Sequence, residues 1–138
     1  MLVLLDTDVV LDYVLQREDF LSEANEIFAF HAKNVFKGYI TANTPLNVYY
    51  FARKKFDAEK ARQTISDLLA TFDICLVDSV ALKSAVISTI TDFEDAVQHA
   101  CAEAANLDAI VTRNLSEYKN ASIPVYSPAE FLNLIKTS

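Results

Sequence analysis

Residues 2–12 of the chain, LVLLDTDVVLD, decide the fold class. Leu2 to Leu5 is an apolar run without alternation, and such a run predicts a strand buried on both faces of a parallel sheet. The run ends at once in acidic residues, first Asp6 and Asp8 and then Asp12. We therefore expect a buried strand near the start of the chain, with carboxylates at its carboxyl end.

Further short apolar runs alternate with longer segments of helical period. These runs are Tyr39 to Ile40, Ile74 to Val77, Ala109 to Val111 and Pro124 to Tyr126. The alternation predicts an α/β protein with helices on both faces of a parallel sheet. No Pro/Gly/Ser-rich linker, internal repeat or low-complexity stretch interrupts the sequence, so we expect residues 1–138 to form a single domain.

Capping motifs mark the starts of three predicted helices. Ser127-Pro128-Ala129-Glu130 and Thr91-Asp92-Phe93-Glu94 are both capping boxes by sequence, and Thr44-Pro45 opens a third helix in the same way. The spacing of Ala, Leu, Ile and Phe predicts further helices in three other segments. These segments are Phe20 to Lys33, Asp57 to Phe72 and Ser79 to Ile90.

Composition excludes several classes of protein. The chain has 138 residues, of which 52% are apolar and 22% are charged, which excludes a disordered chain. This length is typical of one domain of about 100–150 residues, and no apolar run approaches the roughly 18 residues of a membrane span. The first residues include no basic segment before the apolar run, so we expect no secretory signal and a cytoplasmic protein.

Glycine and cysteine usage excludes several kinds of site. The only glycine is Gly38, so a Walker loop or a GxGxxG fingerprint cannot exist, and we expect no nucleotide cofactor. Cys75 and Cys101 have no partner at metal-ligand spacing, which excludes disulfide scaffolds, zinc ribbons and redox CxxC sites. A formal net charge of −7 also argues against electrostatic capture of nucleic acid by the domain as a whole.

Polar side chains follow two of the predicted strands. Asp6 follows the first strand, and Thr112-Arg113-Asn114 follows Ala109 to Val111. In open α/β sheets the ligand crevice lies outside the carboxyl ends of the strands. Asp95 lies in the first turn of the helix opened by Thr91, just before a face of small residues that lets this helix approach the sheet. We therefore expect Asp6, Asp95 and Asn114 to converge.

Converging carboxylates favour a metal site. Like charges within about 4–6 Å repel each other unless a cation lies between them. Hard oxygen ligands with room for water suit Mg²⁺ or Mn²⁺. Such a cation can bind a phosphodiester, polarise it and activate water for attack, so phosphoryl chemistry on a nucleic acid is one natural function.

Each of these residues also has a purely structural interpretation, which the sequence leaves open. An Asp after a strand is often a turn former or a helix N-cap, which applies to Asp6, Asp8 and Asp12. Asp92 and Glu94 are candidate caps of the helix that carries Asp95. Two further features also have two interpretations. His99 is either a metal partner of Asp95 or a packed side chain. The basic residues Arg53-Lys54-Lys55, with Lys60 and Arg62, are either an RNA contact or a solvated helix end.

Four segments in order along the chain resemble the PIN-domain ribonucleases, the group that includes the VapC-type toxins. The segments are LVLLDTDVVLDYVL, TPLNVYYFARKK, DFEDAVQHACAEAANLDAIVTRN and IPVYSPAEFL, and together they cover almost the whole chain. The resemblance implies a three-layer α/β/α sandwich with a central, mainly parallel sheet of four to five strands. It also implies an acidic cluster that binds Mg²⁺ or Mn²⁺ and hydrolyses RNA, a cognate antitoxin protein as partner, and a homodimer formed through the helices.

The resemblance assigns roles position by position. Asp6 matches the first family acid and Asp95 the third, whereas the second, a Glu, falls at Asn47 and the fourth, an Asp, falls at Asn114. Asp8 matches a position thought to orient the first acid, and Asp8 and Glu117 are also candidates to compensate for the missing acids. An amide oxygen still coordinates Mg²⁺ but carries no formal charge, so we expect a weak or substrate-restricted nuclease.

Two other functions remain open at the sequence level. Asp6-x-Asp8-x-Val10 also resembles the first motif of haloacid-dehalogenase-type phosphatases, in which the first Asp is the nucleophile, although the glycine that normally follows is absent. With two acids replaced by amides, the domain could instead bind RNA or protein without cutting. The aromatic residues near Arg53 are compatible with such an interface: Tyr49, Tyr50 and Phe51.

Overall fold

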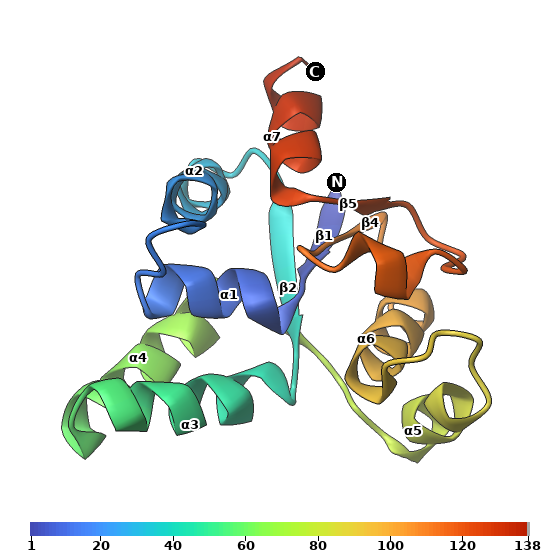
Figure 1. The fold of residues 1–138 in the computed structure, drawn as a ribbon, viewed down its shortest axis with the longest axis horizontal. Helices are drawn as coiled ribbons and strands as arrows, with labels where there is room; N and C mark the ends of the chain where they lie inside the picture. The colour runs from blue at the N-terminus through green and yellow to red at the C-terminus, as the bar shows by residue number, and fades with distance from the viewer. Residues whose placement is uncertain (138) are drawn as a thin grey trace.

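A five-stranded, wholly parallel sheet forms the centre of the protein, as the computed structural model of residues 1–137 shows (Figure 1). The strand order is β3-β2-β1-β4-β5. The strands are β1 (Leu2–Leu5), β2 (Lys37–Thr41), β3 (Asp73–Cys75), β4 (Ala109–Val111) and β5 (Val125–Tyr126). The predicted α/β class, the parallel sheet and the strand number are confirmed, and the bounds of β1 and β4 match the prediction.

Helices cover both faces of the sheet and produce three layers. Val3 and Leu5 belong to one core, and Leu4 belongs to the other, because successive side chains of a strand point to opposite faces. The first core is closed by α1 (Thr7–Val14), α2 (Leu21–Ala32), α3 (Thr44–Lys55), α4 (Ala58–Thr71) and α7 (Pro128–Lys136). The second is closed by α5 (Ser79–Val86), α6 (Phe93–Ala104) and the 3₁₀ helix η1 (Leu115–Tyr118).

The strand β1 is apolar on both faces because both faces are covered. Val3, Leu4 and Leu5 are each 0% exposed. From β1 the chain builds β2 and β3 on one side and β4 and β5 on the other. This reversal of direction places a crevice outside the carboxyl ends of β1 and β4, where open α/β sheets bind their ligands. Among residues 1–137, no helix has both the length and the apolar character that crossing a membrane requires.

All three predicted helix starts are confirmed to within one residue, but the predicted N-cap residue is correct in only one of them. Ser127 and Glu130 form the expected capping box at α7. The second box is displaced by one residue: the N-cap of α6 is Asp92, whose Oδ1 accepts the Asp95 N–H at 3.0 Å, because a carboxylate is a better cap acceptor than the hydroxyl of Thr91. Thr44 is the first helical residue of α3 rather than its cap, and its hydroxyl bonds to that of Thr7 at 2.8 Å.

The other helix ends show what periodicity can and cannot predict. The segments Phe20 to Lys33 and Asp57 to Phe72 each exceed the observed helix by one residue at each end. The segment Ser79 to Ile90 is too long, because α5 ends at Val86 and the Ser88 hydroxyl then accepts the Ile90 N–H in a turn. Helix α1, of eight residues, was not predicted, since its start coincides with the acidic segment.

Gly38 lies in β2 where two rings approach the strand closely. A Cβ atom at this position would lie 2.8 Å from the Phe72 ring and 2.9 Å from Cδ2 of His31. The two rings are themselves packed, with centroids 4.6 Å apart, and burial lowers the pKa of His31. The only glycine of the sequence is therefore required by packing against β2 and not by a turn.

We expect Gly38→Ala to destabilise the protein by about 1–3 kcal/mol, because an added methyl group in a packed core forces its neighbours to move. Urea unfolding measures this loss. Phe72→Leu makes room at the same point, so the double variant should lose less stability than the two single variants together. Strict additivity of the two losses would show that the ring does not limit this position.

Candidate functional site

The carboxyl ends of β1 and β4 meet beside Asp6. Leu5 pairs with Val111, and the Asp6 N–H donates to the Val111 carbonyl at 2.9 Å. The residues that follow the two strands, Asp6 and Thr112, therefore both lie at the crevice. The Thr112 hydroxyl then donates to Asp6 Oδ2 at 2.8 Å. Both side chains are buried, with Asp6 5% exposed and Thr112 0% exposed. The register of two strands therefore determines where the first acid points.

Asp6 has a structural role and a site role at the same time. Its Oδ1 accepts the Asp8 N–H at 3.2 Å, which makes Asp6 the N-cap of α1, as its structural interpretation predicted. Its other oxygen faces away from the helix and accepts from Thr112 and, at 3.2 Å, from the Tyr118 hydroxyl. One carboxylate can do both because each oxygen offers two lone pairs.

Asp95 comes from the opposite wall of the crevice. It lies in the first turn of α6 and is 6% exposed. Its Oδ1 accepts from the Tyr118 hydroxyl at 3.2 Å and from Gln98 Nε2 at 3.4 Å. The small side chains Ala96 and Ala100 are buried against the sheet, as their pattern predicted, so the start of α6 lies close to β1. A single tyrosine hydroxyl thus links the first and third predicted acids.

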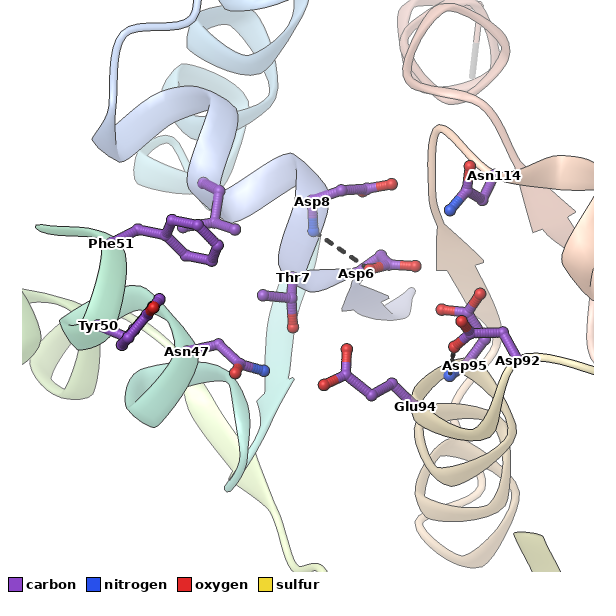
Figure 2. Close-up of a pocket in the computed structure, with 11 residues that line it drawn as sticks. Asp6, Thr7, Asp8, Asn47, Tyr50, Phe51, Asp92, Glu94, Asp95 and Asn114 are labelled. Carbon is purple, nitrogen blue, oxygen red and sulfur yellow. Dashed lines mark hydrogen bonds between the residues drawn. The ribbon is translucent and has the colours of Figure 1, made fainter. Parts of the chain in front are cut away.

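An open cleft of about 400 Å³ contains these groups and the two predicted amides. Asp6, Asp8 and Asp95 line it together with Asn47 and Asn114 (Figure 2). The remaining lining residues are Thr7, Leu11, Tyr50, Phe51, Asp92 and Glu94. In Figure 2 the side chains of Asn47 and Glu94 point toward each other across the cleft, so an acid that the sequence assigned to helix capping faces the site. The predicted residues therefore share one cleft.

Crowding and burial of carboxylates raise their pKa values here. Burial, then the charges of Asp6 and Asp92, raise the pKa of Asp95 to about 7. Burial, then the charge of Asp6, raise the pKa of Asp8 to about 7, against the lowering effect of Arg113. Both shifts mean that the protein without a counter-ion disfavours the charged forms. A cation among these groups would relieve both the desolvation and the repulsion.

Asp8 has one oxygen that the protein leaves without a donor. Its Oδ2 accepts the Arg113 N–H at 3.2 Å, which ties α1 to the segment after β4. Its Oδ1 is buried and has no hydrogen-bond partner within residues 1–137. A buried carboxylate oxygen without a donor is costly unless a cation or water satisfies it. Asp8 thus offers a buried acceptor oxygen, without a donor among the described residues, close to the first acid.

Three other acidic or basic candidates lie elsewhere. Asp12 is paired with Arg113, whose Nε lies 2.7 Å from its Oδ2, and so fastens α1 to the segment after β4 instead of facing the cleft. His99 Nε2 accepts the Ser122 N–H at 3.0 Å and makes no contact with Asp95. Glu117 is in η1 and does not line the cleft.

Comparison with known proteins identifies the family. The sequence profile of the PIN domain matches residues 2–116. This range includes the predicted site acids Asp6 and Asp95 and the amides Asn47 and Asn114. The chain belongs to the PIN-domain family. A comparison with curated protein sequences gives no match. The family assignment of this PIN domain therefore rests on the profile match, and the description of its site rests on its own geometry.

Solved structures share the fold at low sequence identity. DNA-bound VapBC from Salmonella typhimurium has a TM-score of 0.70 at 19% identity, with 93% of this PIN domain and 99% of that chain covered. A toxin-antitoxin complex from Klebsiella pneumoniae has a TM-score of 0.67 at 23% identity, with 91% and 97% covered. VapBC2 from Rickettsia felis, bound to a DNA fragment from its promoter, has a TM-score of 0.68 at 16% identity, with 92% and 98% covered.

The donor set of this PIN domain suits a hard divalent cation. All groups that converge are carboxylate, amide and hydroxyl oxygens, and Asp8 Oδ1 is a buried oxygen without a donor. In the described part of the chain, no three His, Cys, Asp or Glu side chains form a ready metal cage. The residues thus fit a cation held by Asp6 and Asp95 with amide or water oxygens, and not a closed all-carboxylate site.

Sequence analysis missed the buried donors of the site. Tyr118, Gln98 and Thr112 donate to the acids, and the side chains of all three are buried. Gln98 lies three residues after Asp95, and this helical spacing could have placed it on the same face. Nothing comparable marks Tyr118, because its approach to Asp6 depends on η1 folding back over the sheet.

We expect Asp95→Asn to stabilise the metal-free protein at alkaline pH. The pKa of Asp95 is raised in the folded state, so ionising it costs stability as the pH rises from about 4, its ordinary pKa, through about 7. In EDTA, the variant should melt higher than wild type at pH 8, and the difference should shrink toward pH 4. Asp19→Asn, at an exposed position, is the matched control. An equal melting temperature at pH 8 would contradict the repulsion described here.

Proposed function

We propose that this PIN domain is an endoribonuclease that depends on Mg²⁺ or Mn²⁺. The observation that carries the proposal is the convergence of Asp6 and Asp95 from separate elements at one cleft, where both accept from the Tyr118 hydroxyl. Asp6 and Asp95 would hold the cation, with Asn114, Asn47 and Asp8 as further oxygen donors. When bound, such a cation supplies Lewis-acid activation of a phosphodiester and neutralises the charge between the acids.

The side chains of the protein position the reacting groups. Thr112 and the Asp8 N–H fix Asp6 in one orientation, so its carboxylate does not need to reorganise during the reaction. Glu94 has no hydrogen bond among the described residues and lines the cleft, which makes it available to accept a proton from an attacking water. Asn47 can donate to a phosphate oxygen through its amide, which a carboxylate cannot do.

The wall of the cleft that α3 forms is suited to a single-stranded RNA. Tyr50 and Phe51 line the cleft and are 56% and 37% exposed, with ring centroids 5.3 Å apart. Lys54 Nζ lies 4.2 Å from the centroid of the Tyr50 ring. Exposed aromatic rings stack on unpaired bases, and a neighbouring cation attracts the backbone. These features support RNA as the substrate and unpaired nucleotides as the segment bound.

The two amides support the proposal of weakened activity. Asn47 and Asn114 keep the positions of two family acids in the cleft, but each removes one negative charge from the cation site. The same observation favours the second candidate function, a PIN domain that binds RNA or protein without cutting. The family assignment decides against the haloacid-dehalogenase interpretation of Asp6 and Asp8.

We also propose a cognate antitoxin as partner. Solved structures that share the fold include a toxin-antitoxin complex and VapBC bound to DNA, and the cleft is rich in acid. A partner that directs a basic side chain toward Asp6 and Asp95 would neutralise the same charges as a cation.

We also propose a homodimer formed through the helices. Exposed apolar side chains in α5 and directly after it support this proposal: Val80, Leu82, Val86 and Ile87. We propose that this assembly acts in the cytoplasm.

Cleavage of RNA by the purified protein tests the proposed function. Labelled single-stranded and hairpin RNAs incubated with Mn²⁺ should be cut at internal positions, and EDTA or Asp6→Asn should abolish the cutting. Asp12→Asn is not a suitable control because Asp12 supports the fold through Arg113, so Asp19→Asn serves instead. Cutting that survives Asp6→Asn would contradict the proposed role of Asp6. Absence of cutting by the wild type, with binding retained, would favour the non-catalytic function.

Restoring a family acid at position 47 should strengthen the binding of Mg²⁺. Asn47→Glu adds a negative charge at a position that already faces the cleft, and we expect Mg²⁺ to bind about tenfold more tightly, since affinity rises with ligand charge. Isothermal titration with Mg²⁺ measures the change. Asn43→Glu, one residue before α3 and outside the cleft lining, is the control. Unchanged or weaker binding in Asn47→Glu would show that position 47 does not contact the cation.

A further inference from the structure

The packing around Tyr118 does not explain why residue 118 is a tyrosine. Tyr118 ends η1 and is 2% exposed, with its ring packed in the same core as Leu4 and Ile110. Packing alone would be satisfied by phenylalanine, which lacks only the hydroxyl. The hydroxyl, however, lies between two acids, 3.2 Å from Asp6 Oδ2 and 3.2 Å from Asp95 Oδ1.

Gln98 fixes the direction in which this hydroxyl donates. Gln98 Nε2 donates to the Tyr118 oxygen at 3.0 Å, so the proton of the hydroxyl is free to point at the acids. The amide of Gln98 is itself oriented, because its Oε1 accepts from the Thr7 N–H at 3.3 Å.

The donors reach only one side of the acid pair. Thr112 donates to Asp6 Oδ2 and Gln98 donates to Asp95 Oδ1, and the single proton of the Tyr118 hydroxyl is shared between these same two oxygens. Asp95 Oδ2 has no hydrogen-bond partner among residues 1–137, and Asp95 lines the cleft. Asp95 therefore keeps Oδ2 for a ligand in the cleft, and Asp6 Oδ1, which accepts only the Asp8 N–H at 3.2 Å, keeps a second lone pair. Groups that orient metal ligands in this way commonly change affinity by about 10–100-fold when they are removed.

We propose that Tyr118, supported by Gln98, is a positioning residue that holds Asp6 and Asp95 at the separation and orientation in which both bind one divalent cation. This inference rests on the cation site of the proposed function and adds the groups that preorganise it. Without the hydroxyl, the two like-charged carboxylates lose their shared donor and turn apart. A cation must then bring them together again before both can bind it.

Mn²⁺ binding measured by electron paramagnetic resonance tests this inference without any RNA. Tyr118→Phe keeps the packed ring and should weaken Mn²⁺ binding by about tenfold or more, with an unchanged circular dichroism spectrum. Tyr126→Phe is the matched control, because the Tyr126 hydroxyl has no hydrogen-bond partner within the described residues and its ring is also part of the core. Its Mn²⁺ affinity should equal that of the wild type.

A second variant tests the support that the Gln98 amide gives to the Tyr118 hydroxyl. Gln98→Met keeps the length of the side chain but removes the amide, so it should weaken Mn²⁺ binding in the same direction, even if Tyr118→Phe fails to fold. Equal affinity in wild type and both variants would overturn the positioning role and leave the proposed function intact. Tighter binding in Tyr118→Phe would overturn it too, because the hydroxyl would then compete with the cation. A wild-type protein that binds no Mn²⁺ overturns this inference together with the proposed cation.

Discussion

Two buried carboxylates, Asp6 and Asp95, are the constraint on which the rest of the structure depends. Each is nearly inaccessible to water, and a buried charge is costly unless hydrogen bonds or a counter-ion satisfy it. The protein supplies donors from Thr112, Tyr118 and Gln98. A hydrogen bond to a charged group contributes about 1.5–3 kcal/mol, so these donors offset much of the burial but not the mutual repulsion. The remaining repulsion would favour the binding of a cation between the two carboxylates.

The fold keeps this unfavourable pair together through elements that are themselves well packed. The carboxyl end of β1 is held by its register with β4, and the ion pair of Asp12 with Arg113 fastens α1 to the segment after β4. Asp12 is 1% exposed whereas the Arg113 side chain is 27% exposed, so loss of Arg113 would leave a buried carboxylate without its closest partner. These packed elements keep the two acids at one cleft although their charges repel each other. Such a trade between stability and function is common at active sites.

The net charge of −7 takes on a local meaning once the cleft is seen. Asp6, Asp8, Asp92, Glu94 and Asp95 all line it, so part of the negative excess is concentrated where a divalent cation would neutralise it. The positively charged residues at the end of α3, by contrast, follow the aromatic wall of the same cleft. The net charge of the whole domain disfavours nucleic acid, whereas the basic end of α3 favours it. Selective binding is thus more consistent with the charge distribution than tight non-specific binding.

The sequence by itself determined the α/β class, the buried central strand and two of the site acids. It could do so because a continuous apolar run predicts burial on both faces, and because residues that follow parallel strands meet at one edge. Local patterns also placed the capping box at Ser127, which depends on hydrogen bonds within four residues. They placed the cap of α6 one residue too early, because Thr91 and Asp92 are both common N-caps and the carboxylate of Asp92 is the better acceptor.

Tertiary structure decided which polar residues share the cleft and which serve the fold. Asp12 and Asp8 are both acids of the same helix, yet packing pairs Asp12 with Arg113 and leaves Asp8 at the site. Tyr118 reaches the acids only because η1 folds back over the sheet, which joins residues more than a hundred positions apart in the chain. Such contacts depend on distances across the core, and no periodicity of the sequence encodes them. The sequence therefore specified the acids of the site, and the fold specified the groups that hold them.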